Sequence, residues 1–112
     1  MTEYIKTVAN ETNTQITVNL HIRLGEQEVR DNYDKIEIKL EKGKKADVVL
    51  PTEGNKGKMP FLNSLDVLSE DYKYLDMAVK NKGDETDNLL NTNKTITIIN
   101  LSGEKIGIKG TN

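Results

Sequence analysis

The sequence predicts an all-β protein, an antiparallel two-sheet β-sandwich that is immunoglobulin-like in its general architecture. Aliphatic and polar residues alternate in several segments, as they do when one face of a sheet is buried and the other meets water. Turn-forming residues separate these segments at intervals of roughly eight to twelve residues, which is typical of sandwiches. At 112 residues, the chain is expected to form one domain over 1–112.

The clearest predicted strand is Thr14–Leu24, in which aliphatic and polar side chains alternate without interruption. The aliphatic row should face the core and the polar row should face water. Because no other segment carries so many aliphatics on one face, we expect this strand to lie inside a sheet. The inward row is Ile16, Val18, Leu20, Ile22 and Leu24, and the outward row is Gln15, Thr17, Asn19, His21 and Arg23.

A weaker alternation precedes this strand. Glu3–Ala9 predicts a short first strand, although Lys6 interrupts its apolar face. Asn10–Asn13 is then expected to form a polar turn, because Asn and Thr side chains readily hydrogen-bond to the nearby main chain.

A hairpin is expected after the connection Gly25–Asp34. Lys35–Glu41 and Ala46–Leu50 both alternate, and Gly43 between them can adopt the positive φ that a tight turn requires. The following segment, Thr52–Pro60, contains glycines and a proline and is therefore expected to be a surface loop.

The segment Phe61–Lys82 fits two structures. Read as a helix at about 64–82, it has Asn63 or Ser64 as its N-cap and Gly83 just beyond its end, which would make the protein α+β. Read as a hairpin, it has two alternating strands around a turn at Ser69–Asp71. The β-branched and aromatic residues, and the strands predicted on both sides, favour the hairpin.

The C-terminal part predicts two more strands. Gly83–Asn93 reads as a polar connection, and Lys94–Leu101 is a strand rich in β-branched residues. After a turn around Gly103, the short strand Lys105–Lys109 is bracketed by lysines, as protected sheet edges often are.

Composition excludes several classes of partner. The chain carries 16 basic and 18 acidic side chains, so no strong field attracts nucleic acid or an anionic membrane surface. No apolar run is long enough to span a membrane. The N-terminus lacks the basic and apolar regions of a signal peptide, which favours a cytoplasmic location by default. Cysteine is absent, which excludes disulfides and thiolate metal sites.

No catalytic signature is found, and we expect the protein not to be an enzyme. The single histidine, His21, lies in the outward row of its strand, where a hydrogen bond to a neighbouring strand is the ordinary role. The nucleophile elbow and the glycine-rich phosphate loop are both missing. A hydrolase with carboxylates paired from distant segments is the least favoured class.

One loop offers candidate metal ligands. Asp84, Glu85 and Asp87 supply the hard oxygen atoms that Ca²⁺ prefers, although their spacing is not that of an EF-hand. Acidic residues beside glycine are also common in ordinary exposed turns. No other cofactor is indicated.

The pattern as a whole favours a non-catalytic module for protein-protein interaction or self-assembly. The short terminal strands could pair with another protein or a second copy through sheet edges. The candidate edge residues are Tyr4, Ile5, Ile106 and Ile108. The alternative is a carbohydrate- or calcium-binding module that uses the loops Asn10–Asn13 and Asp84–Asn93.

Overall fold

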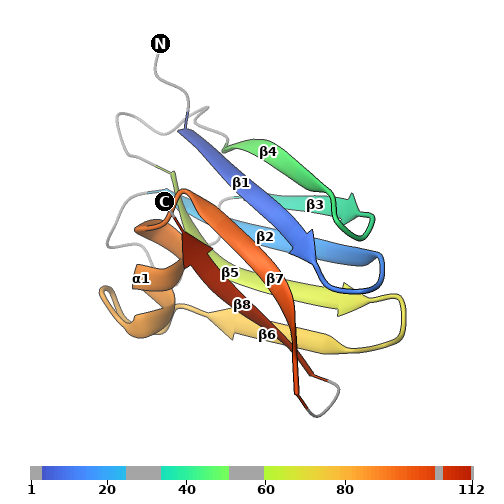
Figure 1. Ribbon diagram of the computed structural model, residues 1–112. Helices are drawn as coiled ribbons and strands as arrows, with labels where there is room; N and C mark the ends of the chain where they lie inside the picture. The colour runs from blue at the N-terminus through green and yellow to red at the C-terminus, as the bar shows by residue number, and fades with distance from the viewer. Residues whose placement is uncertain (1–3, 25–33, 51–59, 103–104, 112) are drawn as a thin grey trace.

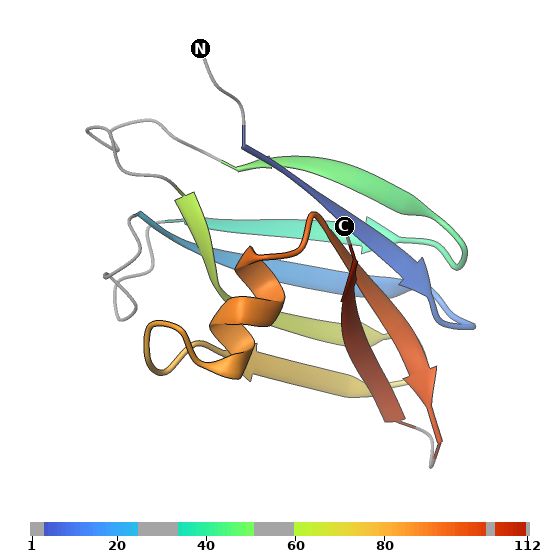
Figure 2. The same cartoon turned by 60° about the vertical axis from the view of Figure 1, so that its left-hand side comes forward.

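The computed structural model describes residues 4–24, 34–50, 60–102 and 105–111. Two four-stranded sheets pack face to face, and a short helix lies at one end of the sandwich (Figures 1 and 2). The predicted β-sandwich is therefore confirmed. Most of the predicted connections Gly25–Asp34 and Thr52–Pro60 lies outside the described residues.

Eight strands and one helix occur in the described ranges. They are β1 (Tyr4–Glu11), β2 (Ile16–Leu24), β3 (Asp34–Leu40), β4 (Lys45–Leu50), β5 (Pro60–Ser69), β6 (Tyr74–Ala78), α1 (Glu85–Asn91), β7 (Thr95–Leu101) and β8 (Lys105–Thr111). Among the described residues, no helix is long and apolar enough to cross a membrane.

We call the two sheets A and B. Sheet B has the order β3-β2-β5-β6 and is antiparallel throughout. Its second strand, β2, lies between β3 and β5, so the predicted inner position of this strand is confirmed. The inward side chains of β2 are buried in the core shared by the two sheets. They include Ile16, Val18, Leu20 and Ile22.

The second sheet, sheet A, has the order β4-β1-β7-β8. Its central pair, β1 and β7, is parallel, and this is the one described pair that departs from the antiparallel prediction. Because β1 lies between β4 and β7, it is an inner strand and not the edge strand expected for Tyr4 and Ile5. The sequence could not show this, because the neighbour β7 comes from the far end of the chain.

The ambiguous middle segment forms a hairpin of β5 and β6, and the helix alternative at 64–82 is wrong. Alternating side chains of β5 enter the core, among them Leu65 and Val67. The turn that follows β5 holds Tyr72 at a positive φ of 67°. The predicted positive φ of Gly43, in the turn between β3 and β4, is confirmed at 76°. The hairpin predicted for these two strands is wrong, because β3 pairs with β2 in sheet B and β4 pairs with β1 in sheet A.

The helix α1 replaces part of the predicted polar connection Gly83–Asn93. Its N-cap is Asp84, whose side chain accepts a hydrogen bond from the N–H of Asp87, and acidic residues occupy its first turn. Leu90 buries the helix against the core. The helix contacts β5, β6 and β8 and so covers one end of the sandwich (Figure 2).

Candidate functional site

The candidate calcium ligand Asp84 is engaged as the cap of α1. Its Oδ1 accepts a hydrogen bond from Asp87 N at 2.8 Å, and its Oδ2 accepts from Lys80 N at 3.0 Å and Asn81 N at 3.1 Å. These main-chain donors hold the pKa of the Asp84 carboxyl below its usual value. The carboxylate therefore has a structural role at the start of the helix.

Asp87 is engaged in a buried ion pair. Its Oδ1 lies 3.0 Å from Nη2 of Arg23 and accepts a second hydrogen bond from Asn91 Nδ2 at 2.8 Å. Its Oδ2 accepts from Gly83 N at 2.8 Å. Burial by itself would raise the pKa of Asp87, but the hydrogen bonds from Gly83, Arg23 and Asn91 and the guanidinium charge outweigh it and lower the pKa.

Arg23 lies fully buried, at 0 % exposure, and the prediction that it faces water is wrong. The Asn63 side-chain oxygen accepts from its Nη1 at 3.2 Å, and the Phe61 ring centroid lies 5.0 Å from its Cζ. The ion pair with Asp87 of α1 accompanies this burial. A bulge in the partner strand supplies Asn63: His21 pairs with Ser64 and Ile22 pairs with Leu62, so that Asn63 is an extra residue on β5.

The three predicted calcium ligands do not converge. Among the described residues, no group of three or more His, Cys, Asp or Glu side chains could hold a metal ion. Asp84 and Asp87 use their carboxylate oxygens in hydrogen bonds within the fold, and Glu85 is an exposed residue in the first turn of α1. The local sequence signal that they share is thus that of a helix N-terminus.

Lys6 fixes the other end of the helix. Its ammonium group donates to Leu90 O at 2.6 Å and to Asn93 O at 2.5 Å, while the whole residue is only 7 % exposed. A cation at these carbonyl groups compensates the negative end of the helix dipole, for which α1 has no basic residue of its own. Burial lowers the pKa of Lys6.

The loop Asn10–Asn13, a candidate saccharide site, also serves the fold. Asn10 is buried and its Nδ2 donates to Thr14 O at 2.8 Å and to Leu40 O at 3.0 Å. Its Oδ1 accepts from the N–H of Thr12 at 2.9 Å. The expected bonding of this turn to the main chain is confirmed, and it joins the end of β1 to the end of β3.

His21 forms a hydrogen bond across the sheet, as expected from its position on β2. Its Nε2 lies 3.1 Å from Oδ2 of Asp66, whose Oδ1 accepts from Asn19 Nδ2 at 2.8 Å. Ser64 is the residue opposite His21 on β5, yet no hydrogen bond joins these two side chains in the described structure.

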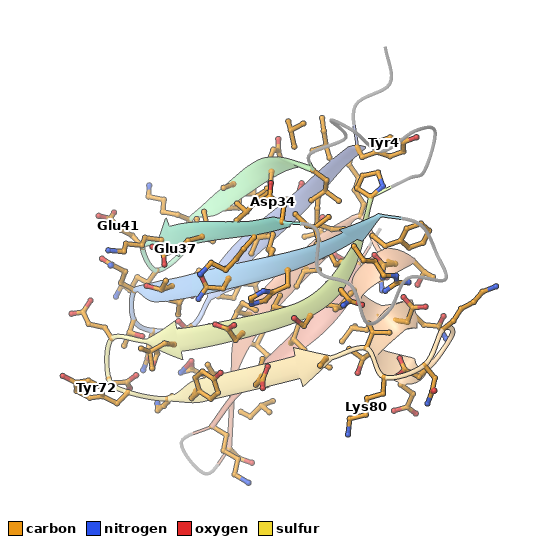
Figure 3. The ribbon with its side chains drawn as sticks, turned by 180° about the vertical axis from the view of Figure 1, so that it is seen from behind. Tyr4, Asp34, Glu37, Glu41, Tyr72 and Lys80 are labelled. Carbon is orange, nitrogen blue, oxygen red and sulfur yellow. The ribbon has the colours of Figure 1, made fainter. Side chains whose placement is uncertain are left out.

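Three large exposed side chains that are apolar or aromatic lie at the turn between β5 and β6. Leu68 and Tyr74 form a cross-strand pair on the outer face of sheet B and are 46 % and 61 % exposed. Tyr72, in the turn, is 87 % exposed and is seen in Figure 3 at the end of the sheet. We call these three residues the hairpin patch.

A shallow pocket of about 200 Å³ adjoins the hairpin patch. Leu68 and Tyr72 form part of its wall, and the rest is mostly polar. The other lining residues are Gln15, Thr17, Ser69 and Glu70. The sequence pattern did not reveal this surface, because the aromatic residues of the segment served only to distinguish a hairpin from a helix. The missed signal was the aromatic residue directly after the polar turn Ser69–Asp71.

The predicted edge residues of β8 face the core. β8 is an edge strand of sheet A, but Ile106 is buried and Ile108 packs partly against the core. The edge itself therefore presents main chain and the side chains of Lys105 and Lys109, both exposed.

Neither a scan of protein-family models nor searches of curated proteins and of solved structures finds a match to this chain. The immunoglobulin-like character expected from the strand pattern therefore stays a prediction.

Proposed function

We propose that this protein is a non-catalytic interaction module that contacts a partner protein through the hairpin patch. The observation that carries the proposal is Tyr72, a bulky aromatic residue that combines a positive φ of 67° with 87 % exposure. Its side chain does little for the fold, although its backbone conformation is costly.

The conformation of Tyr72 is one that glycine adopts far more easily. A non-glycine residue in the left-handed region costs about 1–2 kcal/mol, and an aromatic residue there is a true outlier. The turn is otherwise well made: Tyr72 N donates to Ser69 O at 3.0 Å, and Ser69 N donates to Lys73 O at 2.8 Å. A tyrosine at this position is thus explained by what its side chain contacts outside the chain.

The composition of the hairpin patch fits a protein contact. Tyrosine is enriched at interfaces, since it offers a large rigid surface with a polar end, and exposed aromatic residues often dominate binding energy. Around the patch the outer face of sheet B is polar, with Thr17 beside Leu68 and with Asp66 and Asp76 in the next cross-strand row. An apolar centre with a polar rim is the usual anatomy of a binding surface.

Selection from a random peptide library on the immobilised protein tests this proposal and does not require the partner to be identified first. We expect selected peptides to bind the wild type and to lose at least tenfold in affinity for Tyr72→Gly and for Tyr74→Ser. The matched control is Leu101→Ser, which removes an exposed leucine on the other sheet. Peptides that bind all four proteins equally well would contradict the proposal.

A saccharide is the second candidate partner, favoured by the pocket beside Tyr72. Exposed tyrosines next to amide, hydroxyl and carboxylate groups, here Gln15, Thr17 and Glu70, offer a stacking surface and hydrogen-bonding groups together. Binding on a glycan array that disappears in Tyr72→Gly would support this candidate. An empty array, with peptide binding intact, would exclude it.

A further inference from the structure

Strand β6 differs from the other three sheet edges. The edge strands β3, β4 and β8 carry lysines, which discourage pairing with another chain. β6 has the sequence YLDMA, with Asp76 as its only charged residue. Of the edge strands in the described structure, it is the least protected against the addition of a further strand.

The hydrogen bonds of β6 show which main-chain groups face outward. Val79 N donates to Asn63 O at 2.9 Å, and Ser69 N donates to Lys73 O at 2.8 Å, so that odd-numbered residues bond to β5. In an antiparallel ladder the intervening residues point the other way. The N–H and C=O groups of Tyr74, Asp76 and Ala78 are therefore directed away from β5.

The inner face of β6 is incompletely covered. Leu75 packs against the core, yet both Leu75 and Met77 remain half-buried. The helix α1 contacts β6. Because the chain runs from Ala78 through Val79 towards α1, the helix covers the Ala78 end of β6 more than the Tyr74 end (Figure 2). A strand added beside β6 would cover the exposed parts of Leu75 and Met77. At the Tyr74 end of β6 it would also lie next to the hairpin patch.

We propose that β6 pairs antiparallel with β6 of a second copy of this chain, so that the two B sheets become one continuous sheet. The inference goes beyond the proposed function, because the pairing uses the outward main-chain groups of β6, whereas the hairpin patch is formed by exposed side chains. A second copy fits because the outward N–H and C=O groups of Tyr74, Asp76 and Ala78 are matched by the same groups of an antiparallel copy.

The charge of Asp76 excludes one register, and the closure of the Ala78 end by α1 favours a shift toward Tyr74. Pairing Asp76 with itself would place two carboxylates directly opposite one another, which is unfavourable. A shift that places Tyr74 opposite the partner's Asp76 avoids this contact and lets both residues use their outward main-chain groups. Leu75 then lies on the two-fold axis, opposite the partner's Leu75 on the inner face of the sheet.

Cysteine cross-linking tests this register, because the chain has no cysteine of its own. Across a non-hydrogen-bonded pair the Cα atoms are about 4.5 Å apart, within reach of a disulfide. We expect Leu75→Cys to form a covalent dimer under mild oxidation. Met77→Cys is the matched control, since its two copies would lie roughly 13 Å apart along the strands. Equal cross-linking of both variants, or none, would overturn the register.

Light scattering over a range of concentrations tests the pairing itself. Asp76→Pro removes an outward N–H and leaves the bonds to β5 intact, so we expect the wild type to double in mass with concentration and Asp76→Pro to remain a monomer. Asp76→Asn, which removes only the charge, should dimerise at least as well as the wild type. A wild type that stays monomeric, or an Asp76→Pro variant that still dimerises, would overturn the inference. Peptide binding that depends on Tyr72 would leave the proposed function standing in either case.

Discussion

Arg23 on β2 and Asp87 on α1 lie 64 positions apart in the chain and form a buried ion pair with a distance of 3.0 Å between Nη2 and Oδ1. The pair fastens the helix over the end of sheet B. Lys6 binds the opposite end of the same helix through Leu90 O. A helix of seven residues is too short to be stable alone, so these contacts hold it in place.

Removal of one partner of this ion pair should be costly. We expect Asp87→Ala to lower the free energy of unfolding by about 3–5 kcal/mol, because it leaves the Arg23 guanidinium buried without its counter-charge. Urea denaturation measures this loss. The control is Glu85→Ala, an exposed residue of the same helix, which should change stability by no more than about 0.5 kcal/mol. Equal effects of the two substitutions would contradict the role given to the pair.

Acidification should destabilise the protein through the same carboxyl groups. The pKa values of Asp84 and Asp87 are lowered in the folded protein, mainly by main-chain hydrogen bonds at Asp84 and by bonds that outweigh burial at Asp87. The two carboxylates therefore contribute fully to the free energy of unfolding above the ordinary carboxyl pKa of about 4. This contribution is lost as the pH falls through their lower pKa values in the folded protein.

Urea midpoints measured from pH 7 down to pH 3 check this pH dependence. The wild type should lose stability below about pH 4, and Asp87→Asn, which cannot titrate at this position, should lose less over the same interval. If the urea midpoints of the two proteins fell equally with pH, Asp87 would not contribute to the loss of stability in acid.

The strain at Tyr72 gives a prediction with an unusual sign. Tyr72→Gly should raise the free energy of unfolding by about 0.5–1 kcal/mol, because relief of the left-handed conformation exceeds the entropy cost of glycine. Tyr74→Gly should instead lose about 1 kcal/mol, since it places glycine within a strand and removes the partner of Leu68. Thermal unfolding of both variants measures the difference. A destabilised Tyr72→Gly protein would show that the side chain supports the fold after all.

Strand β2, one of the two inner strands of sheet B, should be the most sensitive to truncation. Leu20 is fully buried on β2, and Leu20→Ala should cost about 2–5 kcal/mol, from lost burial and from the cavity that remains. Val49→Ala removes an exposed aliphatic side chain from an edge strand and should cost less than about 0.5 kcal/mol. Chemical denaturation of the two variants should separate them clearly.

The strands could be predicted from sequence because burial on one side leaves an alternating pattern. This was sufficient for β2 and β3, and also for the hairpin of β5 and β6, where β-branched and aromatic residues decided between strand and helix. The sheet order could not be predicted, since alternation shows which face is buried but not which strands are neighbours.

Residues whose environment depends on distant segments were the ones that sequence reasoning missed. Arg23 has the position of a solvent-facing cation on its strand, and Lys6 interrupts the apolar face of its own strand. Both are buried and bind α1. The helix itself had a local signal, Asp84 as a cap with acidic residues after it, but the same oxygens also suggested metal ligands. The hydrogen-bond donors that the structure places at Asp84 and Asp87 distinguish the helix cap from the metal site.

The hairpin patch was missed for the opposite reason. In the sequence, Tyr72 and Tyr74 are informative only as aromatic residues that favour a strand over a helix. The turn geometry that leaves Tyr72 exposed depends on the hydrogen bonds of Ser69, which composition alone does not reveal.

The parallel pair of β1 and β7 has a consequence for the order in which the molecule can assemble. All four strands of sheet B lie between residues 16 and 78, whereas β1 needs a partner that begins at Thr95. Closing so long a loop is entropically expensive and slows folding. During synthesis, sheet B therefore has all of its strands well before sheet A does. The edge of β1 that pairs with β7 stays unpaired until the last part of the chain has been made.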